Sequence, residues 1–246
     1  MTSRTDPESV PPSQLIETGG ANGERQPGVV GNERLTALAG AALLVLLLVE
    51  LASAVSLRAG ITLHLVLGLL LTGPLLVKLG ATGYRFLRYY AGAPAYRRKG
   101  PPRPPLRVLA PPLVVTTLAV VGSGIGLMVT GPQQAGVLLP LHNLSVLVWL
   151  ALIAVHVCAY FRRTIRLIGD EWAERAREKP HLARWLRLGV NLGAVFGGAV
   201  AATLLFPDVA SWVAWSRAGE TLPAPLIVGL VVAIPVLLAS RPWRWR

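Results

Sequence analysis

Three of the four histidines lie inside apolar stretches, and their spacing indicates a shared task. His142 and His156 are fourteen residues apart in one stretch, and in another His64 is followed at the same spacing by Lys78. Fourteen residues advance an α-helix by about 21 Å and return the side chain to within about 40° of the same face. Ionisable side chains at membrane depth are costly and usually functional. Each stretch therefore presents two reactive side chains at two depths.

The two stretches can face each other if they cross the membrane in the same direction. His64 and His142 then lie at similar depth near one surface, with Lys78 and His156 level near the other. Matched imidazoles on facing helices can bind haem iron on its two sides through neutral ring nitrogens. We therefore predict a haem site at His64 and His142, and treat His156 as the marker of a second iron site.

Lys78 stands opposite His156 and has three interpretations. Its deprotonated amine could bind iron, because burial favours the uncharged form. Its side chain could instead contact a haem propionate or a quinone oxygen. It could also extend along the helix to reach the membrane surface.

Glycines near the histidines would give a flat macrocycle room beside the backbone. Gly68 lies one turn from His64, and Gly122 and Gly126 belong to the run VGSGIG at roughly the depth of His142. We include Gly68, Gly122 and Gly126 among the candidate cofactor-binding residues. The alternative is close helix packing through small residues spaced by four.

The composition indicates the elements that must position these residues. Of the 246 residues, 53% are hydrophobic and only 15% are charged, whereas soluble domains carry roughly 25% charged residues. Six apolar runs are each near the ~20 residues that span a bilayer: 35–57, 60–82, 107–130, 140–163, 185–206 and 223–240. We predict an all-α membrane protein with six transmembrane helices and a four-helix haem-binding bundle as its core.

The domain organisation follows from these runs. Residues 1–34 are rich in Pro, Gly, Ser, Glu and Arg, which predicts a disordered cytoplasmic tail. Residues 35–240 form the predicted membrane domain, with its haem-bundle core at about 60–163. Residues 241–246 form a basic cytoplasmic tail, and residues 170–187 could form an amphipathic helix on the inner surface.

The net charge of +12 is concentrated in connections between apolar runs. Seven basic residues and no acids lie between Arg85 and Arg107, and eight basic residues lie between Arg162 and Arg187. This is the positive-inside pattern, which predicts an integral plasma-membrane protein with both termini in the cytoplasm. The same placement argues against nucleic acid as a partner.

Two helices that each carry ligand positions thirteen or fourteen residues apart resemble the di-haem four-helix b-type cytochromes. These include the cytochrome b-561 superfamily and the ferric-reductase membrane domain. The run LLVKLGATGYRFLRYY, followed by GAPAYRRKGPP, is also similar to small bacterial relatives of the membrane subunits of molybdopterin oxidoreductases. The resemblance covers about residues 60–163.

The resemblance implies two haems held by four histidines, with electrons crossing the membrane and exchanging with quinone. His64, His142 and His156 match three ligand positions, and Lys78 departs from the pattern at the fourth. One haem b is therefore expected, with a second haem and quinone as further candidates.

The sequence predicts a b-type cytochrome-like electron-transfer protein in a lipid bilayer, working between quinone and a partner redox protein or subunit. No flavin, nicotinamide or molybdenum motif is present, so any substrate chemistry would belong to an oxidoreductase of which this chain is the membrane cytochrome subunit. The alternative is a haem-free scaffold or small transporter whose histidines make polar contacts between helices.

Overall fold

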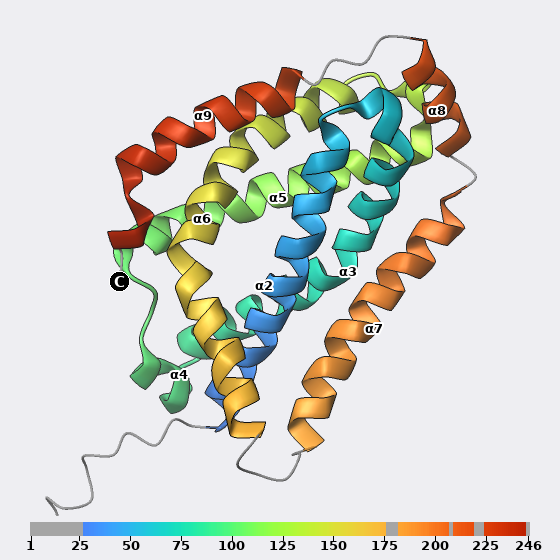
Figure 1. The fold of residues 1–246 in the computed structure, drawn as a ribbon. Helices are drawn as coiled ribbons and strands as arrows, with labels where there is room; N and C mark the ends of the chain where they lie inside the picture. Colours follow the sequence, from blue (N-terminus) through green and yellow to red (C-terminus); the bar gives the residue numbers. More distant parts are fainter. Residues whose placement is uncertain (1–26, 176–181, 207–208, 219–223, 245–246) are drawn as a thin grey trace, which may run out of the picture.

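The computed structural model describes residues 27–175, 182–206, 209–218 and 224–244, and no strand occurs within these ranges. The predicted all-α class is confirmed (Figure 1). The helices are α2 (Pro27–Ala54), α3 (Leu57–Tyr90), α4 (Pro94–Lys99), α5 (Pro104–Thr130), η1 (Pro132–Gln134), α6 (Leu138–Arg175), α7 (Leu182–Leu204), α8 (Val209–Arg217), α9 (Ala224–Ser240) and η3 (Pro242–Arg244).

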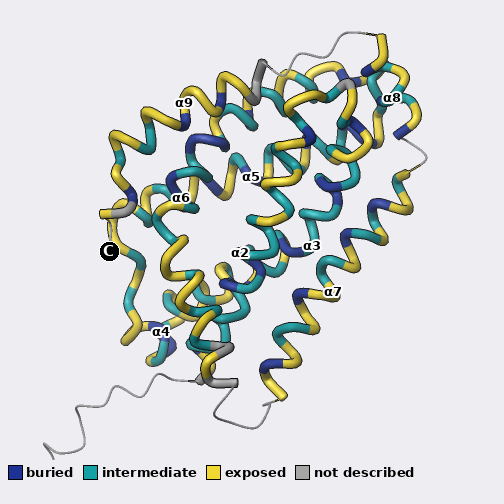
Figure 2. The backbone as a smooth tube through the Cα atoms, viewed as in Figure 1, coloured by how far each residue is buried: buried dark blue, intermediate teal, exposed yellow. Residues whose placement is uncertain are grey.

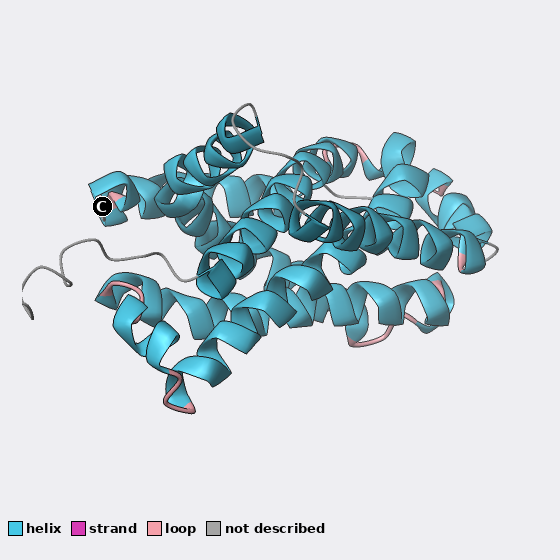
Figure 3. Cartoon of the chain, turned by 90° about the horizontal axis from the view of Figure 1, so that it is seen from below, coloured by secondary structure: helices cyan, strands magenta, loops and turns pink. Residues whose placement is uncertain are grey.

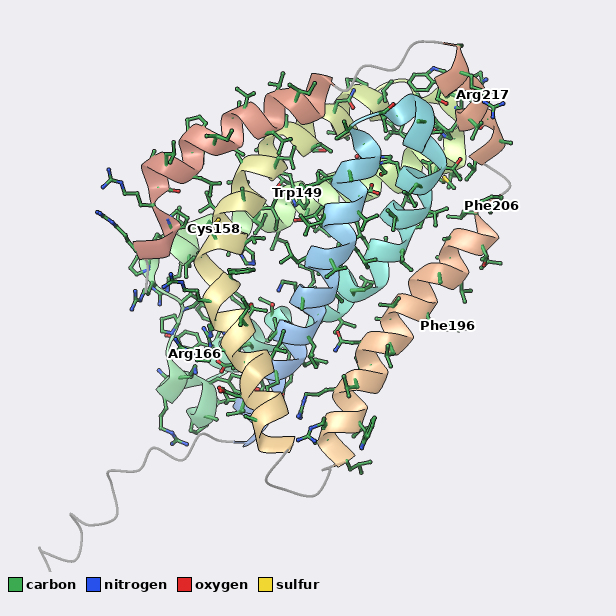
Figure 4. The ribbon with its side chains drawn as sticks, viewed as in Figure 1. Trp149, Cys158, Arg166, Phe196, Phe206 and Arg217 are labelled. Carbon is green, nitrogen blue, oxygen red and sulfur yellow. The ribbon has the colours of Figure 1, made fainter. Side chains whose placement is uncertain are left out.

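Five of these helices are long and apolar enough to cross a bilayer: α2, α3, α5, α6 and α7. Helix α9 has 17 residues and is about 25 Å long, shorter than the ~30 Å hydrocarbon layer. Many large apolar side chains lie on the outer faces, including Phe196 of α7, which is 70% exposed (Figure 4). Figure 2 shows that exposed and half-buried positions dominate every long helix. A lipid environment accounts for this apolar exterior.

Two segments differ from the expectations drawn from the sequence. Helix α2 begins at Pro27, inside the segment 1–34 that was predicted to be a disordered tail; residues 1–26 lie outside the described part. The first turns of α2 are held by tertiary partners, because Asn32 Nδ2 donates to the Ala81 carbonyl of α3 at 3.0 Å. Glu33 Oε1 lies 2.7 Å from an Arg163 nitrogen of α6.

The predicted surface helix over 170–187 is not a separate element. Helix α6 instead continues without a break to Arg175, and α7 begins at Leu182. Good helix formers such as Ala, Glu and Arg allow the helix to continue beyond the apolar span. Residues 176–181 lie outside the described ranges.

The two histidine-bearing helices pack on different neighbours. Helix α3 packs on α2 and α7, whereas α6 packs on α5 and α9. Figure 3, seen from below, shows short loops joining the ends of the helices. The start of α2, α4, the end of α6 and the start of α7 share one end of the molecule, and α8 lies at the opposite end (Figure 1).

Helix α3 is positioned by very close backbone contact with α7. A methyl group built on Gly198 of α7 would lie 2.6 Å from the Leu70 carbonyl oxygen of α3. One built on Gly73 of α3 would overlap the Ala194 carbonyl of α7. Small residues that let backbones approach are how membrane helices gain packing energy.

At the opposite end of the molecule, α8 ties α3 to α5. Trp212 of α8 is buried, and its indole Nε1 donates to the Leu127 carbonyl of α5 at 3.1 Å. Trp212 and Leu127 also share an apolar cluster with Ile61 of α3. This cluster lies one turn from His64 and fixes that end of α3.

The α3–α7 contact makes a testable prediction. We expect Gly198→Ala to lower the stability of the folded chain by about 1–3 kcal/mol, because the added methyl group must push two backbones apart. Gly193→Ala on the same helix is the matched control, since a methyl group there meets nothing within 4 Å. Thermal unfolding in detergent compares the two, and equal melting temperatures would contradict the contact.

Candidate functional site

A cavity of about 560 Å³ lies among α2, α3, α5 and α6. This volume falls within the ~300–1,000 Å³ typical of ligand and cofactor sites. Its walls are mainly apolar. On one side, α6 is linked to α5 by a hydrogen bond from Trp149 Nε1 to Thr117 Oγ1 at 2.9 Å (Figure 4). Among the described residues, the acid, lysine and histidine side chains that also reach the cavity are Glu50, His64, Lys78, His142 and His156.

The structure brings His64 and His142 together across the cavity. Their ring centres are 6.5 Å apart and the ring planes cross at 83°. The sequence predicted this pairing, and it arises although α3 and α6 pack mainly on other helices. The two imidazoles approach each other over a space instead of through a helix–helix contact.

His142 is held by α5. Its Nδ1 lies 3.1 Å from the Val120 carbonyl oxygen and 3.1 Å from Ser123 Oγ. The Ser123 hydroxyl is itself directed to the Ala119 carbonyl, and the Val120 carbonyl can only accept, so Nδ1 carries the hydrogen. The other ring nitrogen, Nε2, keeps its lone pair for a ligand. This arrangement is the usual support of a metal-binding histidine.

His64 is held by a carboxylate of α2. Its Nδ1 lies 2.8 Å from Glu50 Oε1, an ion-pair contact whose angle differs from that of an aligned hydrogen bond. Ser53 Oγ lies 3.5 Å from the second carboxylate oxygen. His64 and His142 are named the outer pair, after the predicted orientation. Both of their Nδ1 atoms face polar groups on other helices, and Nε2 is the nitrogen that remains in each ring.

The separation of the two rings fits a shared metal ion. Two imidazoles on opposite sides of one transition metal have ring centres roughly 6 Å apart, because each nitrogen lies about 2 Å from the metal and about 1 Å from its own ring centre. The 6.5 Å between the His64 and His142 rings agrees with this value. Two imidazoles complete the coordination of an iron that already has the four nitrogens of a porphyrin.

Lys78 and His156, named the inner pair, differ from the outer pair in their contacts. Lys78 and His156 both reach the cavity and are close enough to interact electrostatically. Lys78 Nζ reaches across to α2, where a methyl group built on Gly40 would lie 2.8 Å from it. It therefore does not extend along α3 to the membrane surface. The His156 ring lies 4.8 Å from that of Tyr160, centre to centre. Within the described residues, neither Lys78 nor His156 has a hydrogen-bond acceptor from the protein.

The candidate glycines have roles other than those expected. Gly122 is exposed, with nothing within 4 Å of a built methyl group, and Gly126 packs on Leu138 of α6. Neither lines the cavity, so their cofactor contact stays a prediction. Gly68 does line it, but the nearest group is Glu50 Oε1, 3.8 Å from a built methyl group.

Two important neighbours, Gly124 of the run VGSGIG and Glu50, were not among the predicted site residues. Gly124 leaves space for the His142 ring, because a methyl group built on Gly124 would lie 3.3 Å from Cε1 of that ring. Glu50 lies within the apolar run 35–57, and its contact with His64 was not predicted. Glu50 and His64 both lie within about two turns of the α2–α3 connection. The antiparallel geometry of a helical hairpin could therefore have indicated their contact.

No group of three or more His, Cys, Asp and Glu side chains converges as a metal site in the part of the chain that the structure describes. No family model, curated protein or solved structure matches the chain. The residues and geometry of the cavity therefore carry the functional argument alone.

The tautomer of His142 is directly measurable. In the ligand-free chain at about pH 8, above the ordinary imidazole pKa of about 6.5, we expect ¹⁵N spectra to show hydrogen on Nδ1 and none on Nε2 of His142. Ser123→Ala should leave this unchanged, because the Val120 carbonyl remains as acceptor. Hydrogen on Nε2 in the unaltered chain would contradict the assigned role of α5.

Proposed function

We propose that this chain is a membrane-embedded b-type cytochrome that passes electrons between quinone and a partner redox protein. His64 and His142 would hold one haem b. The observation that carries the proposal is the 6.5 Å separation of two imidazoles whose Nδ1 atoms both face polar groups on other helices, the Val120 carbonyl for His142 and the Glu50 carboxylate for His64. A pair of histidines that only stabilised the helices would be expected to bond to each other or to the walls through both nitrogens.

The residues around the pair suit such a site. Helices α2, α3, α5 and α6 enclose an apolar cavity, and we propose that they are the four-helix haem bundle. The apolar walls exclude water, and the second-nitrogen partners fix the ring orientations. When bound, haem b supplies a one-electron couple, tuned by its ligands and by burial.

A second binding position is proposed at the other end of the cavity. Lys78 and His156 offer nitrogen atoms without protein acceptors, which would suit a second haem or a carbonyl oxygen of quinone. Fourteen residues separate His142 from His156 on α6, or about 21 Å along the helix. The two positions are therefore distinct, and one macrocycle at the outer pair would leave the inner pair free.

The membrane arrangement is proposed from the charge pattern and the helix lengths. We infer that α9 is a sixth, short span packed on α6, and that the end of the molecule bearing the start of α2 and α4 faces the cytoplasm. At this end the Glu33 carboxylate pairs with Lys99 of α4 at 3.1 Å and Arg163 of α6 at 2.7 Å. The membrane would be the plasma membrane.

The proposal predicts a haem spectrum that depends on His142. The purified chain from haem-replete cells should give a reduced-minus-oxidised b-type spectrum with at least one haem by pyridine haemochrome. His142→Gly should lose most Soret absorbance, and added imidazole should restore part of it by filling the vacated space. Leu144→Ala, at a position 63% exposed on the same helix, is the control.

The number of haems per chain and the absorbance of His142→Gly separate the alternatives. One haem per chain supports the outer site alone, and two support the inner pair as well. A well-folded chain without haem, or His142→Gly with unchanged absorbance, would overturn the assignment and favour the scaffold or transporter.

A further inference from the structure

We propose that Glu50 sets the reduction potential of the outer haem site by placing a carboxylate charge against His64, one of the two histidines that would hold the haem. This inference rests on the proposed function, and it assigns to Glu50 a positioning and tuning role. It concerns the one acidic side chain among the described residues that line the cavity.

The carboxylate is held in place by local structure. Glu50 Oε1 lies 2.8 Å from His64 Nδ1, and the Glu50 side chain is only 12% exposed. Ser53 Oγ lies 3.5 Å from Oε2 and donates at 2.7 Å to the Glu50 carbonyl one turn back along α2. Gly68 leaves the carboxylate its space, since a methyl group there would lie 3.8 Å from Oε1. The contact is therefore built from four residues on two helices.

The two axial positions are supported in different ways. The His142 ring is backed by a neutral carbonyl and a hydroxyl group of α5, whereas the His64 ring is backed by a carboxylate. The charge asymmetry is not offset by contact, because Lys78, the one lysine or arginine among the described cavity-lining residues, has its Nζ beside Gly40. Gly40 is ten residues from Glu50 along α2, or about 15 Å.

The sign of the effect follows from electrostatics. A negative charge close to an iron ligand stabilises the oxidised, more positive state of the iron relative to the reduced state. The interaction is strong where the surroundings are apolar, because the effective dielectric constant is low. Hydrogen bonding and charge in the second shell of a metal are established means of tuning its potential. Glu50 should therefore lower the potential of this haem.

The test is a potentiometric titration of the haem-loaded chain in lipid nanodiscs. We expect Glu50→Gln to favour the reduced form at least tenfold at a fixed ambient potential, equivalent to a rise of about 59 mV for a one-electron couple. Glu33→Gln is the matched control: it removes the same charge from the same helix, seventeen residues away, and should change the ratio less than threefold.

A second neutral variant guards against failed assembly. Glu50→Ala should shift the ratio in the same direction, and Glu50→Asp, which keeps the charge, should stay closer to the unaltered chain than either. An unchanged potential in a haem-loaded neutral variant would overturn the inference. Loss of haem from both neutral variants would also overturn it, because Glu50 would then serve haem retention.

The failure of the proposed function looks different. If the unaltered chain binds no haem, the cytochrome assignment itself falls. If it binds haem normally but its potential does not respond to Glu50, only the tuning role is lost.

Discussion

The site at His64 and His142 depends on one constraint: an imidazole that offers one nitrogen to a ligand is oriented by a polar group facing its other nitrogen. His142 meets this constraint through the Val120 carbonyl and Ser123 hydroxyl of α5, and His64 through the Glu50 carboxylate of α2. The partners lie on neighbouring helices, so the pair cannot form until α2, α3, α5 and α6 are all in place. The site is therefore a property of the bundle and not of either histidine-bearing helix.

The same bundle keeps α3 and α6 apart. Close backbone contact at Gly73 and Gly198 holds α3 against α7, while α6 packs on α5 and α9. Each histidine-bearing helix thus satisfies its packing on its outer side, and the space between them stays open as a cavity of about 560 Å³. An open space between α3 and α6 is compatible with a lipid environment. Helix association there is driven by packing at small residues and not by removal of apolar surface from water.

The two ends of the cavity have opposite electrostatic character. The outer end pairs its imidazoles with acceptors, including the carboxylate of Glu50. The inner end presents Lys78 and His156 without a protein acceptor in the described residues. An end that holds a carboxylate and an end that holds a lysine amine would favour occupants of different charge.

The sequence by itself determined the helical membrane class, because hydrophobic runs and helix periodicity are local properties. It also determined the fourteen-residue spacing from His64 to Lys78 and from His142 to His156. Only the tertiary structure decided which neighbours these residues have. It placed Gly124 at the His142 ring, left Gly122 exposed and Gly126 against α6, and directed Lys78 across to α2. It also decided that α2 begins at Pro27, because Asn32 and Glu33 contact residues that are distant in sequence, Ala81 and Arg163. Periodicity fixes which residues share a helix face, but the partner of each face depends on how several helices pack together.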